Sequence, residues 1–283
     1  METNSSYRDC FKNKKRIVVK IGSSSLMHSN TGKLDLAKIE KLVRVLTDIK
    51  NSGKEVILVC SGAIAVGREA LGFADRPTDI AVKQACAAVG QAKLMMVYQK
   101  LFAEYNVVAG QVLLTKANVI DDTGRENAQN TFSEMLKMGV IPVVNENDTV
   151  STDEIEMVQT FGDNDRLSAI VASITHADLI ILLSDIDGLY TDDPNKNKEA
   201  KFVEIVERVE DVLKMGKGSA SNVGTGGMAA KLTAATISVE SCADMVIANG
   251  DRLDNLYGII NGENVGTVFC SVENNNFNIK EYL

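Results

Sequence analysis

Two lysines, Lys20 and Lys231, lie at positions where a lysine side chain is expected to bind an anion. Lys20 lies near the end of an apolar run at residues 16–21, and Lys231 follows a glycine-rich turn, 224–227, that opens an apolar helical segment reaching about Ser241. An ammonium group in apolar surroundings is costly without a counter-charge. A glycine-rich turn at a helix N-terminus binds anions, and helical side chains slant back toward that end. The lysines therefore predict a shared phosphoryl site. The alternatives are a snorkelling or structurally paired Lys20 and a solvated Lys231.

Small residues follow the first two apolar runs. Gly22 permits close backbone approach, and the N–H groups of Ser23, Ser24 and Ser25 can surround a phosphate. After the second run, at 55–60, Ser61 and Gly62 precede a helical stretch at 64–71. This arrangement predicts an anion or carboxylate site, although a serine that only caps the helix explains it equally well.

Amide and carboxylate side chains form two clusters, NEND at 145–148 and GDND at 162–165. Together they suit a small zwitterion, with Asp facing an ammonium group and Asn facing a carboxylate. Either cluster also suits an ordinary turn or cap. A turn-rich loop at 184–194 is either a plain connection or part of a nucleotide site.

The elements that must position these residues alternate between strands and helices. Continuous apolar or β-branched segments predict seven buried strands, at 16–21, 55–60, 107–114, 140–144, 178–183, 244–248 and 267–271. An amphipathic pattern predicts a helix over 36–49 that ends before Gly53. Such alternation is typical of an α/β fold with a parallel sheet, and ligands bind beyond the carboxyl ends of its strands.

Two segments permit weaker predictions. The segment 80–105 is apolar around most of a helix, which either a subunit interface or deep burial explains. Residues 149–161 alternate between polar and apolar, which suits a hairpin over the ligand edge. With three prolines in the chain and no linker-like tract, we expect no separate second domain.

Composition excludes several classes of protein. The 283 residues include 30 Lys and Arg against 38 Asp and Glu, a net charge of −8 that argues against nucleic-acid or membrane-surface binding. The five scattered cysteines indicate reduced thiols and a cytoplasmic protein. We find no signal peptide and no membrane span.

Absent motifs narrow the chemistry further. The P-loop pattern and the nucleophile elbow do not occur, and only two histidines are present, neither near a candidate nucleophile. The residues 224–229 match a dinucleotide fingerprint formally, but no buried strand precedes them. A histidine-based triad or a histidine-rich zinc site is therefore unsupported.

The segments VVKIGSSS, CSGAIAVGRE, NEND, FGDNDRLSA, SDIDGLYTDDP and GTGGMAAK, in this order, resemble the amino-acid kinase family. The combination is most similar to the members that phosphorylate glutamate, over about 16–269. The resemblance implies a three-layer αβα sandwich around a mostly parallel sheet. It bounds a kinase domain at 16–272, between an N-terminal extension at 1–15 and a polar tail at 273–283, with no additional C-terminal domain.

The resemblance also implies a reaction: transfer of the γ-phosphoryl group of ATP to the side-chain carboxylate of L-glutamate, with Mg²⁺ on the phosphates, as the first step of proline biosynthesis. Its implied catalytic residues are Lys20, Asp165 and Lys231, and its substrate-binding residues are Ser61, Asp148 and Asn164. The implied ATP-binding residues are Lys20, Gly22, Ser23, Ser184, Asp185, Thr225, Gly226, Gly227, Met228, Ala229, Ala230 and Lys231. The ligands of the metal are not assigned.

By the same resemblance we expect a homo-oligomer, feedback inhibition by proline, and hand-over of the product to glutamyl phosphate reductase. Three alternatives remain open. They are a sister kinase acting on acetylglutamate or aspartate, a nucleotide-binding oxidoreductase, and a silent relative that binds an amino acid without turnover.

Overall fold

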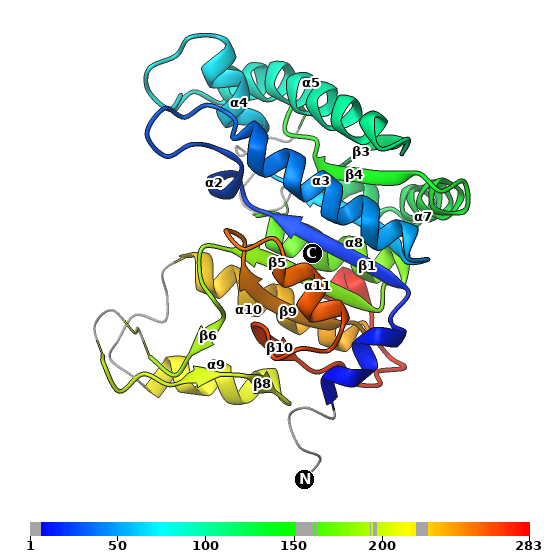
Figure 1. Ribbon diagram of the computed structural model, residues 1–283, viewed down its shortest axis with the longest axis vertical. Helices are drawn as coiled ribbons and strands as arrows, with labels where there is room; N and C mark the ends of the chain where they lie inside the picture. Colours follow the sequence, from blue (N-terminus) through cyan, green and yellow to red (C-terminus); the bar gives the residue numbers. More distant parts are fainter. Residues whose placement is uncertain (1–6, 151–160, 162, 193, 195–196, 219–225) are drawn as a thin grey trace. The chain divides into compact units, whose positions relative to one another are not determined.

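The computed structural model describes residues 7–150, 161, 163–192, 194, 197–218 and 226–283. The chain forms two compact units (Figure 1). Unit 1 combines Met1–Val19 with Asp165–Tyr282, and unit 2 is Lys20–Asn164 with Leu283. The predicted hairpin at 149–161 lies almost entirely outside the described residues, as does Thr225 of the glycine-rich turn.

Strands and helices alternate as the sequence predicts. Hydrogen bonding orders the strands β3-β4-β2-β1-β5-β9-β10-β8. Where register is given, neighbouring strands are parallel except β10, which runs antiparallel to β9. The predicted α/β class, with helices around a mostly parallel sheet, is confirmed. β1 (Arg16–Ile21) contributes its first four residues to unit 1 and its last two to unit 2.

Unit 2 builds its strands from three predicted apolar segments. Its elements are α2 (Ser23–Leu26), α3 (Leu36–Asn51), β2 (Glu55–Cys60), α4 (Ala63–Ala70), α5 (Ile80–Glu104), β3 (Ala109–Leu114), α6 (Lys116–Ile120), α7 (Asp122–Lys137) and β4 (Ile141–Glu146). The helix α3 buries the predicted apolar stripe except for Leu36, which is exposed, and Asp35 caps its N-terminus by accepting from the Lys38 N–H. After Ser52, Gly53 takes a φ of 94°, which suits a glycine at the end of a helix.

Helices α4 and α5 lie side by side because two glycines let their backbones meet (Figure 1). A Cβ added at Gly67 would lie 1.7 Å from the Cys86 carbonyl oxygen. At Gly90 the added atom would lie 1.8 Å from the Ala63 carbonyl oxygen. No side chain fits at either position, so the glycines fix α4 firmly against α5. Because α4 begins directly after β2, this packing fixes the position of the first residues of α4 at the carboxyl end of β2.

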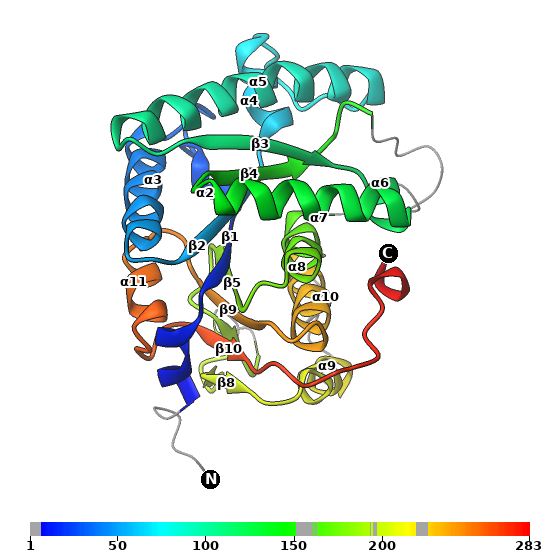
Figure 2. The ribbon, with the colours of Figure 1, turned by 90° about the vertical axis from the view of Figure 1, so that its right-hand side faces the viewer.

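Unit 1 holds the remaining elements around the second half of the strand order. They are η1 (Asp9–Asn13), α8 (Asn164–Thr175), β5 (Leu179–Ser184), β6 (Leu189–Tyr190), β7 (Phe202–Val203), β8 (Ile205–Val206), α9 (Val209–Gly218), α10 (Gly226–Glu240), β9 (Asp244–Asn249), α11 (Asn255–Ile260), β10 (Thr267–Phe269) and η2 (Ile279–Tyr282). Figure 2 shows α11 on one side of β5 and β9, with α8 and α10 on the other. The apolar strands β5 and β9 are thus covered on both faces, as a parallel pair requires.

Residues 7–15, directly before β1, are part of the packed structure of unit 1. Phe11 is fully buried, and Arg8 is 1% exposed. The Arg8 guanidinium donates to four backbone carbonyl oxygens, those of Glu204, Glu263, Val265 and Gly266. This charged side chain therefore joins the N-terminal extension to the segments around β8 and β10.

Three further findings bear on the predictions made from the sequence. All five cysteines are free thiols, which agrees with the predicted reduced state. Within the described residues, none of the helices has the length and apolar character required to cross a membrane. The short strands β6, β7 and β8 were not predicted, since two-residue strands leave no periodic pattern.

Candidate active site

Unit 2 contains a pocket of about 560 Å³ at the carboxyl ends of β2 and β4. Its size is that of small-molecule sites, and its lining carries both signs of charge. The lining residues are Ser23, Ser61, Gly62, Ala63, Ile64, Ala65, Arg68, Arg76, Asn145, Glu146, Asp148, Asp163 and Asn164. The structure thus brings together the three predicted substrate-binding residues and Ser23.

A network of side-chain amides supports this pocket. Asn164 Nδ2 donates to Ser61 Oγ at 2.7 Å, and to the Cys60 carbonyl oxygen and Asn145 Oδ1, each at 3.0 Å. Asn145 Nδ2 in turn donates to Gln91 Oε1 at 3.0 Å, in buried surroundings. These bonds fix the orientation of the Asn164 amide, because its N–H groups face protein acceptors. Its side-chain oxygen is the atom that can accept from a ligand.

Ser61 is not the helix cap that the sequence left open. The N-cap of α4 is Gly62, with a φ of 107° and no side-chain capping bond. Ser61 instead accepts from Asn164 and donates its backbone N–H to the Ile21 carbonyl oxygen at 3.3 Å. The structural alternative for Ser61 is therefore wrong. Glycine at position 62 is required by the left-handed backbone.

Lys20 lies beside the small residues that follow β1. Its side chain is 9% exposed, and Nζ is 3.7 Å from the position that a Cβ on Gly22 would occupy. Ser23, next along the chain, lies close to Gly62 and lines the pocket. The buried ammonium group is thus held over the Gly22 turn rather than extended into solvent.

Two arginines of the pocket were missed by sequence reasoning, whereas Glu146 belongs to the predicted NEND cluster. The buried carboxylate of Glu146 accepts from the Phe161 backbone N–H at 3.2 Å. Arg68 comes from the last turn of α4, and Arg76 from the loop that follows it. Arg68 stands within the CSGAIAVGRE segment, but nothing in that pattern distinguishes an arginine in a pocket from one on a solvated face.

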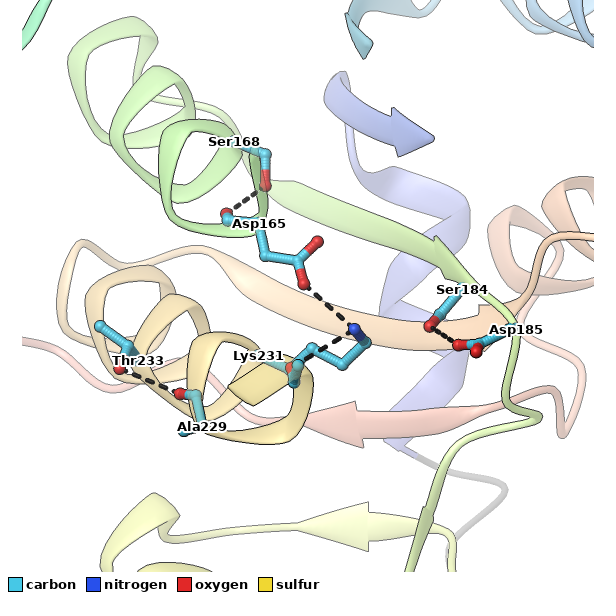
Figure 3. A network of polar contacts seen from close by, with 8 residues as sticks. Asp165, Ser168, Ser184, Asp185, Ala229, Lys231 and Thr233 are labelled. Atoms are coloured by element: carbon cyan, nitrogen blue, oxygen red, sulfur yellow. Dashed lines mark hydrogen bonds and ion pairs between the residues drawn. The ribbon is translucent and has the colours of Figure 1, made fainter. Parts of the chain in front are cut away.

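In unit 1, Lys231 meets Asp165 across two helices (Figure 3). Lys231 Nζ lies 3.1 Å from Asp165 Oδ2, and the two side chains are 12% and 6% exposed. Nζ also approaches the Gly227 carbonyl oxygen at 3.5 Å, one turn earlier in α10. The prediction that Lys231 reaches back toward its glycine turn is confirmed, and a solvated Lys231 is excluded. Ser168 Oγ donates to the Asp165 carbonyl oxygen at 2.6 Å within the first turn of α8.

The end of β5 supplies further polar groups to unit 1. Ser184 Oγ donates to Asp185 Oδ1 at 2.9 Å, as Figure 3 shows, and the register pairs Ser184 with Asn249 of β9. The first turn of α10 comprises Gly226, Gly227, Met228 and Ala229, followed by Ala230. Among the described residues, a Cβ at Gly227 would meet nothing within 4 Å, which leaves room for a ligand beside the backbone N–H groups of this first turn.

Lys20 belongs to unit 2 and Lys231 to unit 1. Their meeting at one phosphoryl group therefore stays a prediction. The described residues contain no group of three or more His, Cys, Asp or Glu side chains suited to a metal. Beside the pocket, burial raises the pKa of the Cys60 thiol to about 12, so this cysteine stays protonated at neutral pH.

One family matches most of the chain. Residues 15–249 match the amino acid kinase family, and the chain belongs to that family. Among solved structures, the UMP kinase of Ureaplasma parvum aligns with a TM-score of 0.64 and 18% identity, over 91% of this chain and 99% of that chain. The isopentenyl phosphate kinase of T. acidophilum aligns with a TM-score of 0.62 and 17% identity, over 90% and 100%. At these identities the likeness shows the fold alone.

Two relatives that share far more sequence carry the name glutamate 5-kinase. The protein from Carboxydothermus hydrogenoformans is 53% identical over 263 residues, which cover 93% of this chain and 69% of the relative. The protein from Clostridium perfringens is 48% identical over 265 residues, covering 93% and 98%. The similarity predicted from short motifs thus extends along nearly the whole chain.

Proposed function

We propose that this chain transfers the γ-phosphoryl group of ATP to the γ-carboxylate of L-glutamate, the reaction for which its relatives are named. The product is L-glutamyl 5-phosphate, and the reaction is the first step of proline biosynthesis. The observation that carries the proposal is the unit 2 pocket, which offers amides, carboxylates and guanidinium groups to a small zwitterion. The 53% and 48% identities to glutamate 5-kinases support the choice of glutamate over acetylglutamate or aspartate.

In this proposal the substrate is held by Ser61, Asp148 and Asn164. Asp148 faces the α-ammonium group, because a carboxylate is the partner that such a group needs. The Asn164 oxygen accepts a further hydrogen bond, since its Nδ2 already donates to protein atoms. Asn164 is followed directly by Asp165, so the residue proposed to bind substrate adjoins the residue that pairs with Lys231.

The nucleotide is proposed to bind unit 1. The first N–H groups of α10, which have no acceptor within the helix, and the helix dipole suit a phosphate, and no described residue fills the space beside Gly227. Lys231 lies over the same turn, while Ser184 is the last residue of β5 and Asp185 follows it directly. The remaining proposed ATP-binding residues are Lys20, Gly22, Ser23, Thr225, Gly226, Met228, Ala229 and Ala230. Mg²⁺ enters with the nucleotide, since in kinases it is bound mostly by substrate phosphates and water.

The proposed reaction requires positive charge and precise positioning rather than a general base. A γ-carboxylate is already ionised at pH 7, so no residue must remove a proton from the nucleophile. The barrier lies in bringing two anions into line, which positively charged groups and fixed geometry lower. Lys20 and Lys231 are proposed to stabilise the transferring phosphoryl group, and Asp165 to hold Lys231 in place.

Finer parts of the proposal concern partners and location. Proline is proposed to inhibit at the glutamate site, the product to pass to glutamyl phosphate reductase, and the protein to act in the cytoplasm as a homo-oligomer. The exposed side chains of Val89 and Met96 on α5 support self-association, because apolar surface on a helix favours burial against a second copy.

Trapping the acyl phosphate tests the reaction. Hydroxylamine converts glutamyl phosphate to a hydroxamate, so the purified chain with ATP, Mg²⁺ and L-glutamate should yield hydroxamate and ADP in equal amounts. Acetylglutamate and aspartate should give at least ten times less. The proposal is wrong if either acid is the better substrate. No ATP turnover combined with amino-acid binding would indicate a silent relative, and quenching of NAD(P)H fluorescence an oxidoreductase.

A further inference from the structure

Arg68 is a cationic side chain of the pocket whose buried nitrogen has no acceptor. Its Nε is shielded from solvent and makes no hydrogen bond to any described residue. A buried N–H without an acceptor is unfavourable, and a guanidinium is the group least able to lose its charge. The pocket that it lines therefore offers an anion a ready partner.

The groups around Arg68 leave its guanidinium available to bind an anion. Glu69, the neighbouring carboxylate on α4, pairs with Lys93 of α5 at 2.9 Å. One edge of the guanidinium faces the backbone at Gly32, where Nη2 is 3.6 Å from the position of an added Cβ. Packing against this loop is the structural alternative for Arg68, and it predicts no effect on the choice of substrate.

The charges of the pocket and of a glutamate ligand indicate which anion Arg68 binds. The carboxylates of Glu146, Asp148 and Asp163 suit an ammonium group, but a glutamate ligand also brings two carboxylates. In the reaction proposed above, the γ-carboxylate must meet the phosphoryl group. The α-carboxylate then needs its own cation.

The direction of α4 supports the assignment. The helix starts beside Ser23, next to the turn that holds Lys20, and Arg68 lies six residues beyond Gly62. A rise of about 1.5 Å per residue separates the two backbones by about 9 Å along the helix. The Arg68 side chain slants back toward the helix N-terminus, which shortens this separation toward the length of one amino acid.

We propose that Arg68 binds the α-carboxylate of the substrate and so selects amino acids that carry a second, free carboxylate. This inference rests on the proposed function. The planar guanidinium of arginine presents paired N–H donors, a geometry that matches a carboxylate and that lysine does not reproduce. Arg76 is exposed and on a loop, so it is the weaker candidate.

The test compares L-glutamate with its α-amide, isoglutamine, which keeps the γ-carboxylate and the ammonium group. The wild-type chain should prefer glutamate in kcat/KM on the order of 10²-fold, the scale of a charge-assisted pair left unmade. Arg68→Met should lower kcat/KM for glutamate by a similar factor, mainly through KM, while the value for isoglutamine stays within about threefold. The kcat/KM of Arg68→Lys for glutamate should fall between the values for the wild type and Arg68→Met. The control is Arg44→Met, which replaces an exposed arginine on α3 and should leave both values as in the wild type.

Each outcome decides one question. Equal losses on both substrates, or no loss on either, would overturn the role of Arg68 and favour packing against the loop at Gly32. Should Arg68→Met fail to fold, Arg68→Lys still carries the comparison, because retained discrimination in that variant would contradict the need for a two-pronged donor. Absence of glutamate phosphorylation by the wild-type chain would instead overturn the proposed function.

Discussion

Lys231 Nζ and Asp165 Oδ2 lie 3.1 Å apart, although 66 residues separate the two in sequence. The pair joins the first turn of α8 to the second turn of α10, and both side chains are nearly buried (Figure 3). The carboxylate partner fixes the direction of the ammonium group, and because that group carries three N–H donors it can also donate to another anion. The pair is therefore a positioned positive charge at the start of α10.

Replacing Lys231 should slow the chemical step. Lys231→Met should lower kcat for hydroxamate formation by on the order of 10²–10³, the effect of removing one preorganised electrostatic donor. Lys20→Met should have a similar effect. Lys93→Met, which breaks the ion pair between Lys93 of α5 and Glu69 of α4, should retain wild-type kcat. A near-normal kcat in either of the first two variants would remove that lysine from the reaction.

Asp148 should matter for substrate affinity rather than for chemistry. Asp148→Ala removes the proposed partner of the α-ammonium group, so KM for glutamate should rise by about 10–100-fold with a smaller change in kcat. Asp75→Ala is the matched control, because Asp75 is an exposed carboxylate that does not line the pocket. An unchanged KM in Asp148→Ala would exclude this residue from the substrate site.

Local patterns predicted much of the fold and part of the site. The apolar runs located the long strands to within a few residues, because buried parallel strands are apolar on both faces. The reach of Lys231 toward Gly227 follows from helix geometry alone, which the sequence specifies within one turn. Ser61 and Asn145 come together because parallel strands end at the same edge, where β2 and β4 are in register.

Other features depend on contacts that no local pattern contains. Arg68 lines the pocket only because Gly67 and Gly90 allow α4 to pack closely on α5. Arg8 finds its acceptors about 200 and 260 residues further along the chain, beyond the range of any periodicity. The tail at 273–283, which the sequence describes only as polar, buries Ile279 and bonds Asn274 to Glu240.

Loss of Arg8 should destabilise unit 1. Arg8→Ala leaves the carbonyl oxygens of Glu204, Val265 and Gly266 without their charged donor, so we expect a loss of about 3 kcal/mol or more in the free energy of unfolding. Lys12→Ala removes an exposed ion pair with Asp9 and should cost at most about 0.5 kcal/mol. Urea unfolding of both variants measures the difference. Equal midpoints would show that the extension adds no stability.

Tyr282 should make the tail sensitive to high pH. Its hydroxyl donates to Glu240 Oε2 at 2.6 Å, and burial together with this bond raises the pKa of Tyr282 to about 12. The unfolded chain releases this proton near pH 10, so between pH 10 and 12 the folded chain holds more protons and its stability falls as pH rises. Below pH 10 the contribution is fully present. The stability difference between the wild type and Tyr282→Phe should therefore hold from pH 8 to 10 and vanish by pH 12. A difference independent of pH would show that the Glu240 bond does not depend on the phenol proton.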